Sequence, residues 1–82
     1  MIAVNVLFFA SLRDDVGMAG IQLNASDTTE LIAALASELS ADAMAALTQD
    51  DVRLAVNQQL IEGVTRLEEG DEVAFLPPVT GG

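Results

Sequence analysis

The segment that decides the fold is Asp27–Leu39, with the sequence DTTELIAALASEL. Asp27 can accept hydrogen bonds from the free amides of a first helical turn, and Glu30 follows it at capping-box spacing. Leucines then recur every four residues, at positions 31, 35 and 39, and give the helix one apolar stripe. The segment therefore predicts a main helix that packs by one side against a sheet.

Segments typical of β-strands flank this helix. Before it, residues 2–9 and 20–24 would pair as a hairpin, with a short helical turn ended by Gly17 between them. After it, further strands are expected at 52–57, 59–62 and 72–76. The alanine-rich stretch 41–49 predicts a second short helix.

This order of elements predicts the fold class. A single main helix covers one face of a sheet, so we expect an α+β fold of the β-grasp type, in which a mixed sheet of about five strands wraps the helix. The expected domain comprises residues 1–76. Residues 77–82 are expected to extend from it as a flexible tail.

The composition excludes several classes of function. The 82 residues suffice for one domain, and they include neither cysteine nor histidine. This removes thiol chemistry, the usual general base and the commonest metal ligands. We therefore expect no bound metal and no autonomous hydrolase or metalloenzyme.

The net charge limits the classes of partner that this chain could bind, and residues 1–10 bear on its cellular location. The formal net charge is −10, with three arginines and no lysine. Such acidity argues against nucleic acid and anionic membranes as partners, and it favours either solubility alone or a positively charged partner. Residues 1–10 lack a basic start and a cleavage pattern, and no stretch is long enough to span a bilayer, so we expect a cytoplasmic protein.

Strand alternation predicts that the second face of the sheet is also apolar. If the first strand packs its even-numbered residues on the helix, Leu7 and Phe9 point away from it, as do Ala74 and Leu76 of the last strand. The first and last strands are neighbours in β-grasp folds, so these side chains would gather, together with Leu60. A large exposed apolar patch commonly marks a partner site. The alternative is that the second short helix covers this face, which would make the patch ordinary core.

The last six residues, PPVTGG, form the expected tail. Pro77 and Pro78 end the last strand and stiffen the base of the tail, while Gly81 and Gly82 carry no side chain and can enter a narrow channel in a partner. The group at the tip is the α-carboxylate of Gly82, which is a poor electrophile until ATP-dependent adenylation in a partner activates it. Gly82 would then carry a transferable group, and the alternative is a flexible end without function.

Three motifs together resemble a known family. They are VLFFASLRDDVG at 6–17, VNQQLI at 56–61 and GDEVAFLPPVTGG at 70–82. The chain resembles the MoaD family, the small subunit of molybdopterin synthase, over essentially its whole length. This family is a ubiquitin-like β-grasp sulfur carrier of molybdenum cofactor biosynthesis. The PPVTGG ending directly after DEVAFL is the most specific part of the resemblance.

The resemblance implies a non-catalytic carrier with several partners. An adenylating enzyme related to ubiquitin-activating enzymes would use ATP in trans on the terminal glycine, and this chain would bind no cofactor of its own. A sulfur donor protein would then form the thiocarboxylate. The large subunit of molybdopterin synthase would hold the active site, where sulfur passes to cyclic pyranopterin monophosphate. The usual assembly is a heterotetramer.

The resemblance also assigns roles to residues of this chain. Gly82 would be the thiocarboxylate carrier and Gly81 its slender neighbour, while Phe9, Leu60 and Leu76 would contact the large subunit. Many relatives have Phe-Phe before the prolines, where this chain has Phe75-Leu76, which keeps an apolar contact but loses a ring. The complete expected partner-binding set is Leu7, Phe9, Leu60, Phe75, Leu76, Pro77, Pro78, Val79 and Thr80.

Three alternatives stay open on the sequence. A sulfur carrier of the thiamine pathway or of another sulfur acceptor shares the β-grasp and the Gly-Gly end. A ubiquitin-like protein modifier shares the adenylation step but is conjugated to lysines of targets. A plain interaction module with an inert tail would keep its function without Gly81 and Gly82.

Overall fold

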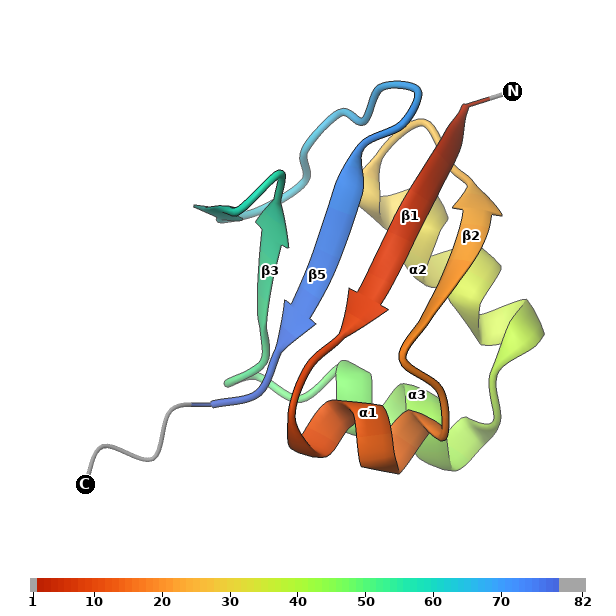
Figure 1. Cartoon of the computed structure of the whole chain (residues 1–82), viewed down its shortest axis with the longest axis vertical. Helices are drawn as coiled ribbons and strands as arrows, with labels where there is room; N and C mark the ends of the chain where they lie inside the picture. Colours follow the sequence, from red (N-terminus) through yellow and green to blue (C-terminus); the bar gives the residue numbers. More distant parts are fainter. Residues whose placement is uncertain (1, 79–82) are drawn as a thin grey trace.

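The structure, a computed structural model, describes residues 2–78. In this part of the chain five strands and three helices follow one another (Figure 1). Their bounds are β1 Ala3–Phe8, α1 Ser11–Val16, β2 Gly20–Asn24, α2 Thr28–Glu38, α3 Ala41–Leu47, β3 Arg53–Val56, β4 Gln59–Ile61 and β5 Glu72–Leu76. The predicted strands and helices all form, with shifts of at most two residues at their ends.

The five strands form one mixed sheet in the order β2-β1-β5-β3-β4. β1 and β5, from opposite ends of the chain, are parallel and lie side by side, whereas the other pairs are antiparallel (Figure 1). This confirms both the predicted hairpin of the first two strands and the predicted adjacency of the first and last strands. The sheet and its helices have the β-grasp architecture.

The start of α2 forms as its sequence predicts, with one change of partner. The Asp27 side chain accepts a hydrogen bond from the Glu30 amide, with a nitrogen–oxygen distance of 2.8 Å. The Glu30 carboxylate, however, accepts from the amide and the hydroxyl of Ser26, at 2.9 and 2.8 Å, and not from the Asp27 amide. These two bonds lower the pKa of Glu30, and the bond from the Ser26 amide has the larger effect.

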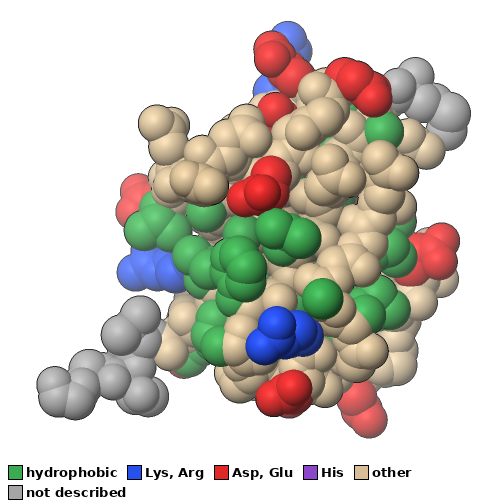
Figure 2. All heavy atoms as spheres, viewed as in Figure 1, with side chains coloured by type: hydrophobic (Ala, Val, Ile, Leu, Met, Phe, Trp, Pro, Cys, Tyr) green, Lys and Arg blue, Asp and Glu red, His purple; other side chains and the backbone are tan. Residues whose placement is uncertain are grey.

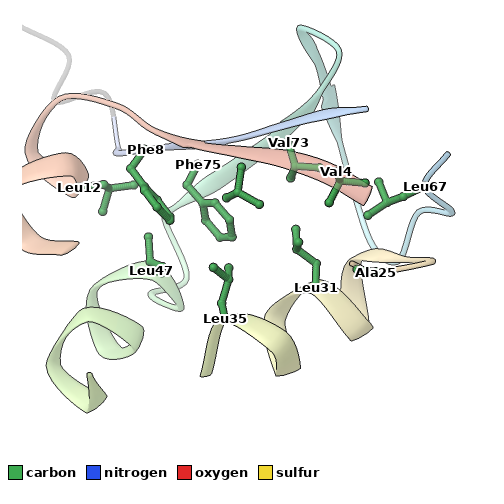
Figure 3. Close-up of a cluster of buried hydrophobic side chains, with 11 residues drawn as sticks. Val4, Phe8, Leu12, Ala25, Leu31, Leu35, Leu47, Leu67, Val73 and Phe75 are labelled. Carbon is green, nitrogen blue, oxygen red and sulfur yellow. The ribbon is translucent and has the colours of Figure 1, made fainter. Parts of the chain in front are cut away.

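The core lies between the sheet and two helices. Leu35 of α2 and Leu47 of α3 point toward Phe75 and Phe8 of the central strands (Figure 3). Leu31 of α2 points toward Val4 and Val73 (Figure 3). The two phenylalanine rings are tilted against each other with centroids 5.8 Å apart. α2 is the main helix, as predicted, and α3, the predicted second short helix, adds Leu47 to the same core.

α1 connects β1 to β2 at one end of the sheet. It buries Leu12 against the core (Figure 3) and ends at Gly17, whose φ of 87° is the left-handed cap that the sequence predicts. It begins after Ala10, which has φ 50° and ψ −127°. Here the Phe9 carbonyl accepts from the Leu12 amide at 3.0 Å, so a tight turn leads directly from the strand into the helix.

None of the helices within residues 2–78 has the length and the apolar character that crossing a membrane requires.

Candidate functional site: the outer face of the sheet

The face of the sheet opposite α2 and α3, here called the outer face, carries a row of apolar residues. The row crosses four strands, because Leu7 of β1 is in register with Ala74 of β5, Ala74 with Ala55 of β3, and Ala55 with Leu60 of β4. Residues in register point to the same side of a sheet. The neighbours of Ala74 along β5, Val73 and Phe75, point to the core, which fixes the direction of the whole row.

The two alanines form the floor of a shallow groove. Ala55 and Ala74 are buried, while Leu60 is 66% exposed and Phe9 is 41% exposed. The groove has a volume of about 420 Å³, and its lining consists of Phe9, Ala55, Gln58, Leu60, Glu72, Ala74 and Leu76. Figure 2 shows hydrophobic side chains gathered over the middle of this face, with acidic and basic side chains along their border.

Both short helices leave this face open. Ala43 and Leu47 of α3 are buried on the helix side of the sheet, so α3 is not the cover that the sequence left as an alternative. Among residues 2–78, the predicted contact residues Phe9, Leu60 and Leu76 therefore share one accessible groove. Their predicted role as partner contacts is consistent with this position.

Leu7 lies at one end of the row, beside β2. Its register partner there is Gly20, where an added Cβ would lie 2.6 Å from the Val6 carbonyl oxygen and 3.1 Å from Leu7 Cδ2. Glycine is therefore needed for the close approach of β2 to β1. Leu7 is half-buried and lies outside the groove lining, so it extends the apolar face but contributes little accessible surface.

Phe75 is not a surface residue, and its place in the predicted contact set is corrected. Its side chain is completely buried and packs on Phe8 in the core (Figure 3). Alternation along β5 forces this result, because Ala74 and Leu76 point to the outer face and Phe75 lies between them. Phe75 supports the outer face from beneath and cannot touch a partner there.

A second hollow lies at the end of β5, beside Pro77 and Pro78, where the predicted tail begins. Its volume is about 500 Å³, and its lining consists of Asp51, Arg53, Leu60, Leu76, Pro77 and Pro78. It shares Leu60 and Leu76 with the groove, so the two form one surface. Val79, Thr80, Gly81 and Gly82 lie outside the described residues, and their predicted roles stay predictions.

The β3–β4 hairpin, which carries Leu60, is fixed by one polar cluster. The Asn57 side-chain amide donates to Asp71 at 3.0 Å, and its oxygen accepts from the Glu72 amide at 3.0 Å. Asp71 also accepts from the Glu68 amide at 2.9 Å. Both bonds lower the pKa of Asp71, and the bond from the Asn57 side chain has the larger effect.

The lining of the groove on the outer face is mainly apolar. Its polar border residues Gln58 and Glu72 flank apolar side chains, and no cluster of acidic residues that could hold a metal ion occurs within residues 2–78. Sequence reasoning missed Ala55, Gln58, Glu72 and Arg53 as parts of this surface. The signal that would have placed them is the register of β3 with β5, which alternation along one strand does not contain.

Comparisons with known proteins find relatives along nearly the whole chain. The model of the ThiS family matches residues 6–82. The chain is 43% identical over 82 residues to the molybdopterin synthase sulfur carrier subunit of Escherichia coli, with 96% of this chain and 99% of that protein covered.

Two solved structures are similar in fold as well as in sequence. One is a protein–protein complex of subunits 1 and 2 of the molybdopterin-converting factor from Helicobacter pylori, with a TM-score of 0.74, 29% identity, and coverage of 99% of this chain and 100% of that chain. The other is the small archaeal modifier protein 1 of Methanosarcina acetivorans, with a TM-score of 0.79, 26% identity, and coverage of 100% and 98%.

Proposed function

This chain belongs to the ThiS family, and on that premise we propose that it is the sulfur carrier subunit of a molybdopterin synthase. Its relative in Escherichia coli carries that name. The observation that carries the proposal is the open apolar face, which continues to the base of a tail ending in Gly-Gly. A carrier needs both a surface that a partner recognises and a slender end that enters the partner's active site.

The reactive atom in this proposal is the carbonyl carbon of Gly82. A carboxylate oxygen of Gly82 attacks the α-phosphorus of ATP in an adenylating enzyme, which forms an acyl-adenylate and releases pyrophosphate. A sulfide equivalent from a sulfur donor protein then attacks the carbonyl carbon, and AMP leaves. The product is a thiocarboxylate, and ATP is used by the enzyme in trans, with no cofactor held by this chain.

The large subunit of molybdopterin synthase is the proposed acceptor partner. The Helicobacter pylori structure, a complex of two molybdopterin-converting factor subunits, supports a partner of this kind. The thiocarboxylate tail enters the active site of the large subunit, where its sulfur passes to cyclic pyranopterin monophosphate. Water then restores the carboxylate, so the carrier can be loaded again. We place all of these proposed steps in the cytoplasm.

The decisive experiment is intact-mass measurement after loading. The purified chain is incubated with ATP, sulfide and the cognate adenylating enzyme. We expect a mass gain equal to the replacement of one oxygen by sulfur, and peptide mapping should place it on Gly82. A variant that lacks Gly82 is the matched control and should gain nothing.

Two results would contradict the proposal. The first is a chain that stays unmodified while the same enzyme preparation loads another carrier. The second is a loaded chain that transfers no sulfur to cyclic pyranopterin monophosphate when the cognate large subunit is present. This second result would point to a carrier for a different acceptor, such as the thiamine pathway.

A protein modifier is the second candidate function, because the Methanosarcina acetivorans neighbour is named a modifier. In that case the adenylated Gly82 forms an isopeptide bond with a lysine of a target, and AMP leaves. A tagged chain expressed in its own organism would then appear in high-mass adducts in which Gly82 is joined to target lysines, and tryptic digestion would leave residues 67–82 on those lysines. We expect no such adducts for a dedicated sulfur carrier.

A further inference from the structure

We propose that Arg53 selects the partner of the outer face by requiring a carboxylate on the partner opposite it. This inference rests on the proposed carrier function and deepens it. Arg53 is exposed at the start of β3 and is in register with Leu76 of β5. Arg53 lies two residues before Ala55 in β3, and residues two apart in a strand point to the same face. Because the Ala55 side chain lies on the outer face, Arg53 belongs to that face as well.

Arg53 lines two hollows, of which one also has Asp50 and Glu62 in its lining. The other contains Leu60, Leu76, Pro77 and Pro78, so Arg53 lies where the groove meets the end of β5. A partner that guides the tail into its active site must cover this point. Arg53 would therefore lose water whenever the tail is engaged.

A covered arginine needs an acceptor. Arg53 forms no ion pair with a residue in the described part of the chain, although Asp51 lines the same hollow. Burying an unpaired charge is costly, and the planar guanidinium fork pairs in bidentate geometry with a carboxylate, the acceptor of this kind that protein side chains supply. The acceptor has to come from the partner, and an aspartate or glutamate fits this chemistry.

This local requirement runs against the overall charge of the chain. A net charge of −10 favours a positively charged partner surface at long range. In the hollow at the end of β5, by contrast, one positive charge, on Arg53, stands beside one negative charge, on Asp51, and the other lining residues are uncharged. A partner surface that is basic overall but has one carboxylate opposite Arg53 would meet the long-range and the local requirement. This carboxylate would distinguish the cognate partner from other basic proteins.

The test compares charge variants in binding to the cognate large subunit. Calorimetric titration of the full chain with Arg53→Glu should give an affinity at least about 30-fold weaker than the wild type, because like charges then face each other. Arg53→Lys should keep part of the affinity. Arg66→Glu, the same charge change at an exposed residue whose backbone forms an isolated β-bridge with Asp27, is the matched control and should change affinity less than about 3-fold.

A rescue arm distinguishes pairing from a structural effect. Partner carboxylates are changed to lysine one at a time, and one of these changes should restore the binding of Arg53→Glu while it weakens that of the wild type. Thermal melting of each carrier variant checks that the fold is intact.

Three results would overturn the inference. They are equal losses for the Arg53 and Arg66 variants, no loss for Arg53→Glu, and the absence of any rescuing partner lysine. Failure of the proposed function looks different, because the wild-type chain would then not bind the large subunit at all, and the inference would fall with it.

Discussion

At the scale of a single residue, Ala10 is held in a backbone conformation that alanine rarely adopts. Its φ of 50° and ψ of −127° are those of a turn position at which glycine is preferred. The turn sends the chain from β1 into α1 and leaves Phe9 on the outer face. Strain of this kind costs on the order of 1–3 kcal/mol and persists only where the surrounding fold imposes it.

We expect Ala10→Gly to stabilise the protein. Relief of the strain, less the extra backbone entropy of glycine, should raise the free energy of unfolding by about 1 kcal/mol. The same substitution at Ala33, exposed in α2, should lower it by about 1 kcal/mol. Urea unfolding of both variants measures the two values, and a loss of stability at Ala10 would show that the turn is not strained.

At the scale of an element, the β3–β4 hairpin depends on side chains because its turn is unusual. Asn57 and Gln58 both have positive φ, at 51° and 71°, although neither is glycine. The hydrogen bonds from Asn57 to Asp71 and from Glu72 to Asn57 hold this turn to the loop between β4 and β5 and to β5 itself. Leu60, two residues further along, is therefore placed by a polar cluster and not by packing alone.

The lowered pKa of Asp71 gives this hairpin a pH dependence. A carboxyl whose pKa is lower in the folded than in the unfolded state stabilises the fold above its unfolded pKa of about 4, and this contribution is lost as the pH falls through the folded value. Wild type should thus be more stable than Asp71→Asn at pH 7, and the gap should shrink below about pH 4. Urea midpoints across this range measure the gap, and a gap independent of pH would contradict the assignment.

At the scale of the whole molecule, the two faces of one sheet divide stability from recognition. The inner face carries the core, with Phe8 and Phe75 at its centre, and the outer face carries the groove. A sheet with one covered face usually presents polar residues on the other. Here the second face is apolar, and the chain keeps it accessible beside the base of the tail.

This division predicts opposite outcomes for two substitutions. Leu60→Asp, at a side chain that is 66% exposed, should change the free energy of unfolding by less than about 0.5 kcal/mol but weaken large-subunit binding at least about 30-fold. Phe75→Ala should cost about 3–5 kcal/mol of stability through the cavity it leaves. Denaturant unfolding and calorimetric titration of the same samples separate the effects. A Leu60→Asp variant that binds normally would exclude the groove as the contact surface.

The sequence was sufficient for the elements and for which side chains share a face within one strand. Helix capping at Asp27, the left-handed cap at Gly17 and alternation in β1 and β5 are local, so they could be read directly. Alternation places Phe75 on the face opposite Ala74 and Leu76, which conflicts with its inclusion in the predicted contact set, and the structure buries it. For Phe75, the local rule was the better guide.

The remaining features depend on contacts between distant parts of the chain. Ala43 and Leu47 mark an apolar side of α3, but nothing in their spacing says which face of the sheet they cover. Likewise, the opposition of Ala55 and Ala74, which makes the groove floor, follows from the register of β3 with β5. Arg53 reaches the tail base through the same register.

The central position of β5 has a consequence for biosynthesis. Because this last strand pairs with both β1 and β3, the two halves of the sheet have no hydrogen-bonded link until it arrives. The domain can therefore complete its fold only after nearly all of it has left the ribosome, and its long-range pairing is of the slow-forming kind. A nascent chain that stops early lacks both the closing strand and the Gly-Gly end. Products that lack β5 would then lack the strand that joins the two halves of the sheet, and we expect them to be open to proteolysis.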